Sequence, residues 1–459
     1  MQETKRLVER CFGLNYKVLP AEVVDRAKDL LLDYLGVAAR GALSDSSRPV
    51  QRTINHLDPS HRGAVVIGTK LRASPPLAAL ANGTAAHSIE LDDVVNEASL
   101  HPGVTVMSTA LAAGHMAGCT GKQLIEAIVA GYETVVRLGI GLDPSAHYAR
   151  GFHPTATCGT MGSAITAAKS LKLNPKEMIN ALGISGSQAA GSMEFLADGA
   201  FTKRFHAGWA AHSGLLAALL AREGFTGPTT IIEGKFGFLK AYSPRPNPDR
   251  ILKGWGQPFQ VLKTSIKPHA CCRYKQGPID GILKIMRANR LAATDIESVT
   301  LGILKTGFPI IVQPEMLKLN PKTIVDAQFS MPFGAAVAIL YGSATLEEYT
   351  KEKLHAPEVK DMMRRIRCVE APELEKEFPQ KWPAIITIKT TSGQEFKVKI
   401  DFPRGDPENP LSPDELIQKF KGLTRPVFPD ERIDKIIDRV LSIEKAGSLK
   451  GLTALLLKD

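Results

Sequence analysis

Cysteine, aromatic residues and long apolar runs are all scarce in this sequence. Six of the 459 residues are cysteine, no two of them form a Cys-x-x-Cys pair, and aromatic residues account for 6%. This usage excludes a disulfide framework and a structural zinc site built from paired thiolates. Cys271 and Cys272 are adjacent, but neighbouring side chains diverge and no second pair follows, so we expect both to be packing residues.

No stretch approaches the roughly 20 apolar residues that are needed to span a bilayer. The first residues, "MQETKRLVERCFGL", include acidic side chains and lack the apolar centre of a secretory signal. We therefore expect a cytoplasmic protein without a membrane partner. The net charge is +10, but the basic residues are scattered singly and in pairs, which argues against a nucleic-acid partner and favours cationic pockets for small anions.

The sequence is rich in amphipathic helical patterns from residue 20 to about residue 240. Apolar residues recur at i, i+3 and i+4 in segments such as "PAEVVDRAKDLLLDYLGVAARG", "GKQLIEAIVAGYETVVRLGIGL" and "HAGWAAHSGLLAALLAREGF". Their many Ala, Gly and Ser residues let helix backbones approach closely. We predict a mainly α protein with a large multihelical domain over residues 1–267.

The pattern changes after residue 267. "IESVTLGIL" and "PAIITIKTTSGQEFKVKIDF" alternate apolar and polar residues, the second around a "TSGQ" turn that is typical of a β-hairpin. A smaller α+β domain is therefore predicted over residues 268–404. Amphipathic helices follow in residues 405–459, and we expect them to return to the helical domain.

Charge is concentrated in "HSIELDDVVNEASLHPG", residues 87–103. If the preceding helix continues through this stretch, Asp92 and Asp93 lie near its C-terminal end, where the helix dipole disfavours each negative charge by roughly 0.3–1 kcal/mol. Such conflicts are expected at functional sites. Two alternatives remain: an exposed loop whose charge is solvated, and a magnesium site, because "DDVVNE" loosely resembles the aspartate-rich motif of terpenoid synthases.

Two further stretches carry candidate catalytic residues. His153 in "RGFHPTATCGTMGSA" precedes a proline, as His101 does, so both histidines should be extended and able to project from loop ends. The small residues after His153 open a helix whose N–H groups could receive an anion, or they only permit close helix packing. In "ADGAFTKRFHAGWAAHSG", Lys203 and Arg204 stand where a helix begins, a position that favours anions over cations.

Other polar residues of these stretches have simpler interpretations. His206 and His212 are six residues apart in an apolar helix, not at the i, i+4 spacing of a metal pair, and we expect core histidines there. The stretch "SIKPHACCRYKQGPID" instead collects cations at the predicted domain change. Such a cluster suits a clamp for a dicarboxylate or tricarboxylate, because arginine binds carboxylates through two hydrogen bonds.

Together these stretches resemble the MmgE/PrpD family. The resemblance runs in order through "ELDDVVNEASLHPG", "GFHPTATCGTMGSA", "ADGAFTKRFHAGWAAHSG", "EGKFGFLKAY", "IKPHACCRYKQGPID" and "DAQFSMPFGAA", and covers nearly the whole chain. It implies a homodimer with a helical domain built from both chain ends and a smaller α+β lid. It also implies action on small polycarboxylates without a metal, an iron–sulfur cluster or an organic cofactor, as in 2-methylcitrate dehydratases, cis-aconitate decarboxylases and iminodisuccinate epimerases.

The resemblance also implies the residues of the active site. Lys203 and Lys267, together with Arg273, would stabilise the enediolate that forms when a proton leaves the carbon next to a carboxylate. His101 and His153 are the expected acid and base. The full set of expected catalytic and substrate-binding residues is Asp93, His101, His153, Lys203 and Lys267 for catalysis, with Glu90, Asp92, Arg273 and Tyr274 for binding.

Three positions depart from the patterns expected within this family. Val94 stands where the decarboxylases carry a threonine, Phe333 where they carry a tyrosine, and Gln276 where many members carry a histidine. We therefore predict a cofactor-independent hydro-lyase of the 2-methylcitrate dehydratase type. The alternatives are an epimerase or isomerase of the iminodisuccinate type, then a cis-aconitate-type decarboxylase, and, outside enzymes, a catalytically silent binding protein.

Overall fold

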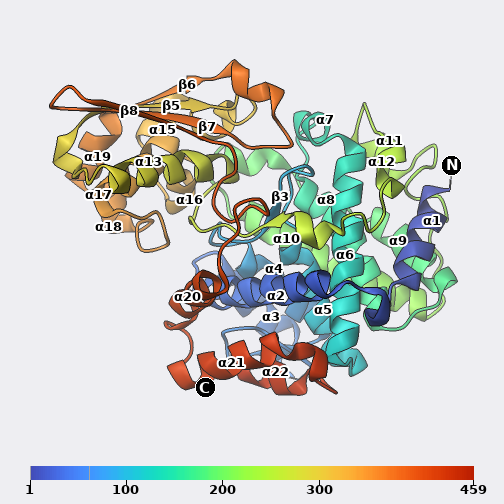
Figure 1. Ribbon diagram of the computed structural model, residues 1–459. Coiled ribbons are helices and arrows are strands. Elements are labelled where there is room, and N and C mark those ends of the chain that lie inside the picture. The colour runs from blue at the N-terminus through green and yellow to red at the C-terminus, as the bar shows by residue number, and fades with distance from the viewer. Residues whose placement is uncertain (1, 61, 459) are drawn as a thin grey trace. The chain divides into compact units, whose positions relative to one another are not determined.

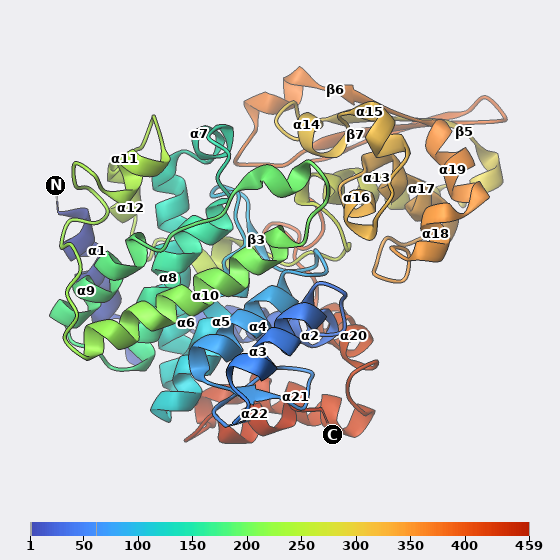
Figure 2. The same ribbon diagram turned by 180° about the vertical axis from the view of Figure 1, so that it is seen from behind.

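The computed structural model describes residues 2–60 and 62–458, which fall into two compact units (Figures 1 and 2). Unit 1 consists of Met1–Thr264 and Ser412–Asp459, and unit 2 consists of Ser265–Leu411. Unit 1 is helical and contains both ends of the chain, whereas unit 2 combines helices with a small mixed sheet. The predicted fold class, a mainly helical protein with a smaller α+β part, is confirmed.

The helices of unit 1 follow the predicted amphipathic segments. They are α1 (Glu3–Gly13), α2 (Ala21–Gly41), α3 (Ser47–Leu57), α4 (Pro75–Ala86), α5 (Gly103–Ala117), α6 (Gly121–Leu142), α7 (Pro144–Ala149), α8 (Pro154–Ser170), α9 (Pro175–Gly186), α10 (Thr202–Arg222), α11 (Phe238–Tyr242), α12 (Asp249–Leu252), α20 (Pro413–Thr424), α21 (Asp430–Leu441) and α22 (Lys450–Leu455). Short strands β1 (Ala64–Val65) and β2 (Arg72–Ala73) pair with each other, and β3 (Val94–Val95) lies between α4 and α5.

Helix α8 forms the core of unit 1. It packs against α5, α6, α9 and α10, and all of its residues except Lys169 are buried. Its glycines make this packing possible, because a Cβ on Gly162 would lie 2.0 Å from Val135 of α6 and one on Gly159 would lie 2.7 Å from Thr105 of α5. The small residues after His153 therefore serve close helix packing.

Helix α4 does not continue through the acidic stretch as far as Asp93. The helix ends at Ala86, and residues 87–102 form a loop that includes β3. Glu90 has a φ of +57°, a left-handed backbone conformation that no continuing α-helix contains. Ending the helix early removes the carboxylates from its unfavourable C-terminal end, so that Glu90 and Asp93 reach partners on other helices and Asp92 reaches two histidines of the loop itself.

Helix α20 brings the C-terminal segment against α2. Leu416 and Phe420 of α20 are buried, and the missing side chain of Gly36 leaves room for the Phe420 ring. Helix α21 is strongly amphipathic and buries Ile433, Ile436 and Val440. None of the helices in the described part of the chain combines the length and hydropathy needed to cross a membrane.

Unit 2 is built on a four-stranded sheet with the order β6-β5-β7-β8. Strand β5 runs parallel to β6 and antiparallel to β7, and the "TSGQ" turn joins β7 and β8 in the predicted hairpin. The bounds are β5 (Ile296–Ile303), β6 (Ile366–Glu370), β7 (Ala384–Thr390) and β8 (Glu395–Ile400), with β4 (Thr264–Ser265) at the boundary between the units. Helix α13 (Gln276–Ala288) packs against β7 and β8.

Shorter helices complete unit 2. They are α14 (Phe308–Ile311), α15 (Glu315–Leu319), α16 (Ile324–Gln328), α17 (Met331–Tyr341), α18 (Lys351–His355) and α19 (Pro357–Arg364). Cys271 and Cys272 are buried free thiols, which confirms the expectation that they are packing residues.

Candidate active site

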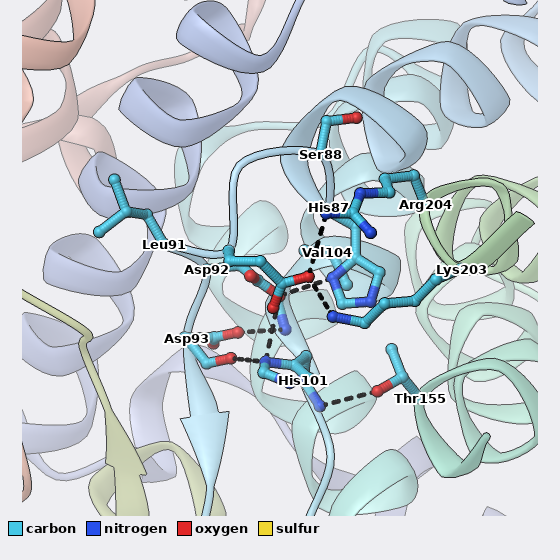
Figure 3. Close-up of polar contacts among 12 residues, drawn as sticks. His87, Ser88, Leu91, Asp92, Asp93, His101, Val104, Thr155, Lys203 and Arg204 are labelled. Carbon is cyan, nitrogen blue, oxygen red and sulfur yellow. Dashed lines mark hydrogen bonds and ion pairs between the residues drawn. The ribbon is translucent and has the colours of Figure 1, made fainter. Parts of the chain in front are cut away.

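The loop after α4 places one carboxylate between two imidazoles. Oδ2 of Asp92 lies 2.8 Å from Nδ1 of His87 and 3.1 Å from Nδ1 of His101. Figure 3 shows these three side chains turned toward one another, with Lys203 beside them. A carboxylate next to Nδ1 keeps the proton of a neutral imidazole on that nitrogen, so Nε2 of such a ring is left with a lone pair that can accept a proton.

His101 is held by its backbone as well as by its ring. Nδ1 lies 2.7 Å from the carbonyl oxygen of Asp93, and the backbone N–H donates to Oγ1 of Thr155 in α8 at 3.1 Å. These contacts, which Figure 3 draws as dashed lines, tie the loop to the central helix. The orientation of the His101 ring is therefore fixed by two segments of the chain.

His87 is a site residue that the sequence interpretation did not select. Its ring is fully buried, and burial lowers its pKa to about 4, so the ring is neutral at pH 7. Within the described part of the chain, no residue forms a hydrogen bond with Nε2 of His87. The available signal was its position five residues before Asp92 in the charge-rich stretch.

His153 stacks on His87 from the start of α8. The ring centroids are 5.6 Å apart with an interplanar angle of 18°. The residue is extended, with φ −92° and ψ 108°, as expected for a residue that precedes proline. Burial lowers the pKa of His153 well below its usual value, and the neighbouring imidazoles of His87 and His206 lower it further.

Helix α10 supplies the positive charge. Nζ of Lys203 contacts Oε1 of Glu90, and Nη2 of Arg204 lies 3.6 Å from the same oxygen. All three side chains are buried. Lys203 and Arg204 at the beginning of α10 thus face a carboxylate. This carboxylate offsets the unfavourable position of two cations at a helix start. The left-handed backbone of Glu90 turns its side chain toward α10.

Both carboxylate oxygens of Asp93 are engaged by the protein. Oδ1 accepts the N–H of Gly103 at 2.9 Å, and Oδ2 accepts the hydroxyl of Tyr132 at 2.6 Å. Burial raises the pKa of Asp93 to about 7, although both hydrogen bonds act to lower it. A Cβ on Gly103 would lie 2.7 Å from Asp93 and Tyr132, so only glycine fits here. Asp93 therefore connects the loop to the first residue of α5 and to α6.

The C-terminal segment reaches the same loop through Lys419 of α20. Its Nζ lies 2.6 Å from Oδ1 of Asp33 in α2 and donates to the carbonyl oxygen of Leu91 at 3.0 Å. The residue that follows Leu91 is Asp92, so this contact holds the backbone that positions the shared carboxylate. No sequence pattern pointed to Asp33 or Lys419.

The remaining predicted residues belong to unit 2. Nη2 of Arg273 lies 2.6 and 2.7 Å from the two carboxylate oxygens of Asp406, and its guanidinium lies 5.3 Å from the ring centroid of Trp382. Tyr274 packs on the same indole at a centroid distance of 4.4 Å. Lys267 is buried. The structure thus gathers Glu90, Asp92, Asp93, His101, His153 and Lys203 within unit 1 and places Lys267, Arg273 and Tyr274 in unit 2.

The carboxylates of the "DDVVNE" stretch all have protein partners. Asp92 contacts two imidazoles, Asp93 accepts from Gly103 and Tyr132, and Glu97 contacts Arg250 and lies 3.2 Å from Nζ of Lys263. Across residues 2–60 and 62–458, no group of three or more His, Cys, Asp or Glu side chains is arranged to hold a metal ion. The donor set therefore does not fit the magnesium alternative.

Imidazoles, buried carboxylates and a buried lysine lie together on a multihelical scaffold, and side chains of these kinds can transfer protons. The chain belongs to the MmgE/PrpD family: residues 5–251 match the MmgE/PrpD N-terminal domain and residues 269–443 match the MmgE/PrpD C-terminal domain. These matches confirm the resemblance drawn from the sequence motifs.

Three relatives illustrate the range of activities among similar proteins. The chain is 28% identical to a cis-aconitate decarboxylase-like protein of Aspergillus oryzae, over 95% of this chain and 94% of the relative. It is also 28% identical to a cis-aconitate decarboxylase of Aspergillus terreus, over 95% and 92%. A 2-methylcitrate dehydratase of Salmonella typhimurium is 24% identical over 95% and 92%.

Proposed function

We propose that this enzyme is a lyase that acts on a small di- or tricarboxylate through proton transfer at a carbon next to a carboxylate. The observation that carries the proposal is the group formed by Asp92, His87, His101 and His153 beside Lys203. Chemistry at such a carbon needs a proton donor or acceptor of suitable pKa, together with fixed positive charge for the enediolate. The imidazoles would supply the first, those of His87 and His153 being neutral at pH 7, and Lys203 would supply the second.

Loss of carbon dioxide is the first candidate reaction. The two relatives described above that are named for cis-aconitate decarboxylation match at 28% identity, against 24% for the dehydratase. This difference favours decarboxylation over dehydration, whereas the motifs predicted dehydration first. When a carboxylate leaves as carbon dioxide, the electron pair of the broken C–C bond stays on carbon and must then take up a proton. His153 and His101 are the proposed donors, and Lys203 is the proposed stabilising charge.

Loss of water is the second candidate reaction, and two residues favour it. Val94 and Phe333 replace the threonine and tyrosine expected in the decarboxylases, and both side chains are buried and apolar. Neither can supply a hydroxyl group. A dehydratase would use one imidazole to remove the α-proton and another to protonate the departing hydroxyl group.

A substrate panel tests the proposal. The pure protein is incubated separately with cis-aconitate, 2-methylcitrate, citrate and iminodisuccinate, while carbon dioxide release, water loss and optical rotation are each followed. We expect carbon dioxide from cis-aconitate. Water loss from a hydroxylated acid would select the second candidate, and a change of rotation alone would select an epimerase.

The matched control for the panel is His153→Ala. Removing a general acid or base lowers turnover by roughly 10²- to 10⁴-fold, so we expect this variant to be nearly inactive while circular dichroism shows an unchanged helix content. Wild-type activity in this variant would remove His153 from the mechanism. Absence of turnover and of thermal stabilisation with every acid would contradict the proposed function and favour a silent binding protein.

A further inference from the structure

Two acceptors from adjacent residues meet at Nδ1 of His101. The carbonyl oxygen of Asp93 lies 2.7 Å from this nitrogen, and Oδ2 of Asp92 lies 3.1 Å from it. The direction of the His101 ring therefore depends on the backbone conformation at Asp93. A catalytic group that is displaced by about 1 Å can lose roughly 100-fold in rate. Whatever holds the backbone of Asp93 thus bears on the alignment of His101.

The side chain of Asp93 is held from two helices. Oδ1 accepts the N–H of Gly103, the first residue of α5, at 2.9 Å, and Oδ2 accepts the hydroxyl of Tyr132 in α6 at 2.6 Å. Gly103 lies only two residues beyond His101, so a shift of this part of the loop would carry it along. Tyr132 instead stands in α6, where residues 127–142 are all buried and the helix packs against α8. Tyr132 therefore ties Asp93 to a support outside the loop.

The hydroxyl of Tyr132 is a constant donor. The residue is fully buried, and burial together with the charge of Asp93 raises its pKa well above the usual value. The phenol thus keeps its proton at every pH at which the protein is expected to work. A short hydrogen bond from a hydroxyl to a carboxylate is among the stronger polar contacts in proteins.

We propose that Tyr132 is a positioning residue for the reaction. Its hydroxyl holds the carboxylate of Asp93, and the carbonyl of the same residue, with Asp92, directs the ring of His101. This inference rests on the proposed function, because it concerns the alignment of a proposed proton donor. Tyr132 does not touch the substrate in this scheme. Its loss should therefore slow the proton transfer without weakening substrate binding.

The test is Tyr132→Phe, which removes one hydroxyl and keeps the ring that fills the core. A buried carboxylate that loses a donor can take up a proton, so we expect the variant to fold. Circular dichroism measures the folded fraction. For each folded molecule, we expect kcat on the substrate found with the panel to fall roughly 10- to 100-fold while KM stays unchanged.

The matched control is Tyr34→Phe. The hydroxyl of Tyr34 in α2 lies 2.7 Å from Oγ of Ser108 in α5, and both residues are buried. In the described part of the chain, no hydrogen bond joins this pair to residues 87–102. Tyr34→Phe should therefore lose a core hydrogen bond and keep its kcat. An unchanged kcat in Tyr132→Phe, or equal losses of kcat in the two variants, would overturn the inference.

A second measurement does not depend on turnover. The ¹⁵N chemical shifts of the His101 ring report its protonation and hydrogen bonds, and the signals are assigned by their loss in His101→Ala. In the ligand-free protein, we expect the Nδ1 signal of His101 to shift in Tyr132→Phe and to stay in place in Tyr34→Phe. An unchanged signal in Tyr132→Phe would overturn the inference alone. If the wild-type protein converts no polycarboxylate, the proposed function fails, while the signals of His101 still decide whether Tyr132 holds the ring.

Discussion

A single carboxylate contacts two imidazoles in this site. Asp92 lies at Nδ1 of both His87 and His101 and so orients both rings, and in the neutral ring of His87 this contact leaves Nε2 with a lone pair. His101 is also tied to the Asp93 carbonyl, whereas the hydrogen-bond partner of His87 among the described residues is Asp92. The buried Nε2 of His87 is destabilising by about 1–3 kcal/mol while no donor meets it. A substrate that brings a donor would remove that penalty.

Replacing His87 by asparagine tests its role at the level of one residue. His87→Asn keeps a side-chain N–H for Asp92 and removes Nε2, so we expect kcat/KM to fall roughly 100-fold while the free energy of unfolding changes by less than about 1 kcal/mol. Urea unfolding and steady-state kinetics measure the two quantities. Full activity in this variant would show that Nε2 takes no part in the reaction.

His147 provides the matched control for this substitution. It is equally buried, and burial lowers its pKa to about 4, but both of its nitrogens are paired: Nδ1 lies 2.9 Å from the Tyr242 carbonyl and Nε2 lies 2.9 Å from Oγ1 of Thr157. His147→Asn should therefore lose about 1–3 kcal/mol of stability and keep the activity of each folded molecule. The two variants thus separate stability from catalysis.

The sequence allowed some site residues to be predicted because they violate local rules. Asp92 and Asp93 conflict with a helix end, and Lys203 conflicts with a helix start, so the reasons for selecting them are visible within a few residues. His87 and His206 conflict with no local rule of helix formation, so the sequence around them gave no reason to select them. Their importance comes from contacts with Asp92 and His153, and the second of these joins residues 53 positions apart. No local pattern encodes such a contact.

The crossing of α4 and α10 sets the distance between the acidic loop and Lys203. The helices cross at two glycines, since a Cβ on Gly208 would lie 2.2 Å from the Leu80 carbonyl oxygen and one on Gly83 would lie 2.8 Å from the Cα of Gly208. Helix α4 ends just before His87, and α10 begins just before Lys203. Wider separation of these helices would therefore move the imidazole away from the lysine.

Gly208→Ala tests this crossing. The added methyl group overpacks a backbone contact, so we expect the free energy of unfolding to fall by about 1–3 kcal/mol. We also expect kcat to fall by more than the loss of folded protein accounts for. The control is Gly422→Ala in α20, where no atom lies within 4 Å of the new Cβ. That change should stabilise the protein by roughly 0.5–1 kcal/mol through helix propensity. Equal stability changes in the two variants would contradict the importance of the crossing.

Elements with a clear period were predictable, and the segment without one was not. The helices and the β7–β8 hairpin follow apolar spacings of 3.6 and 2 residues. The loop of residues 87–102 has no such period, and its course is fixed by the left-handed Glu90 and the buried partners of Asp92 and Asp93. Tertiary contacts decide such a segment, and they come from α2, α5, α6, α10 and α20.

At the scale of the whole chain, the family could be predicted while the reaction could not. Motif order across nearly all of the sequence predicted the family, and the two domain matches confirm it. The choice between losing carbon dioxide and losing water depends on a few side chains around a shared proton-transfer group. Val94 and Phe333 favoured dehydration in the sequence analysis, whereas the two relatives at 28% identity are named as a cis-aconitate decarboxylase and a similar protein, and the one at 24% is named as a dehydratase.

Buried histidines should make the stability of the whole molecule depend on pH. His87, His147 and His206 have pKa values lowered to about 4, and the pKa of His153 is lowered well below its usual value, so the folded chain resists protons that the unfolded chain binds at about pH 6.5. Stability is therefore lost as pH falls below 6.5. At pH 5 a single such histidine lowers the free energy of unfolding by about 2 kcal/mol relative to pH 7.

Asp93 changes the pH dependence of stability in the opposite direction, and the variant Asp93→Asn provides the control. Its pKa is raised to about 7, so the folded chain keeps a proton that the unfolded chain loses above pH 4, and its contribution to stability falls as pH rises toward 7. Among the described residues, lowered pKa values are found for six histidines, since those of His115 and His212 are lowered as well, and raised pKa values for the carboxylates Asp29, Asp33, Asp93 and Glu133. We expect the histidines to outweigh the carboxylates, so that the urea midpoint decreases between pH 7 and pH 5. Asp93→Asn removes the opposing contribution and should make that decrease steeper. A urea midpoint that stays constant over this range would show that the buried imidazoles are protonated without unfolding.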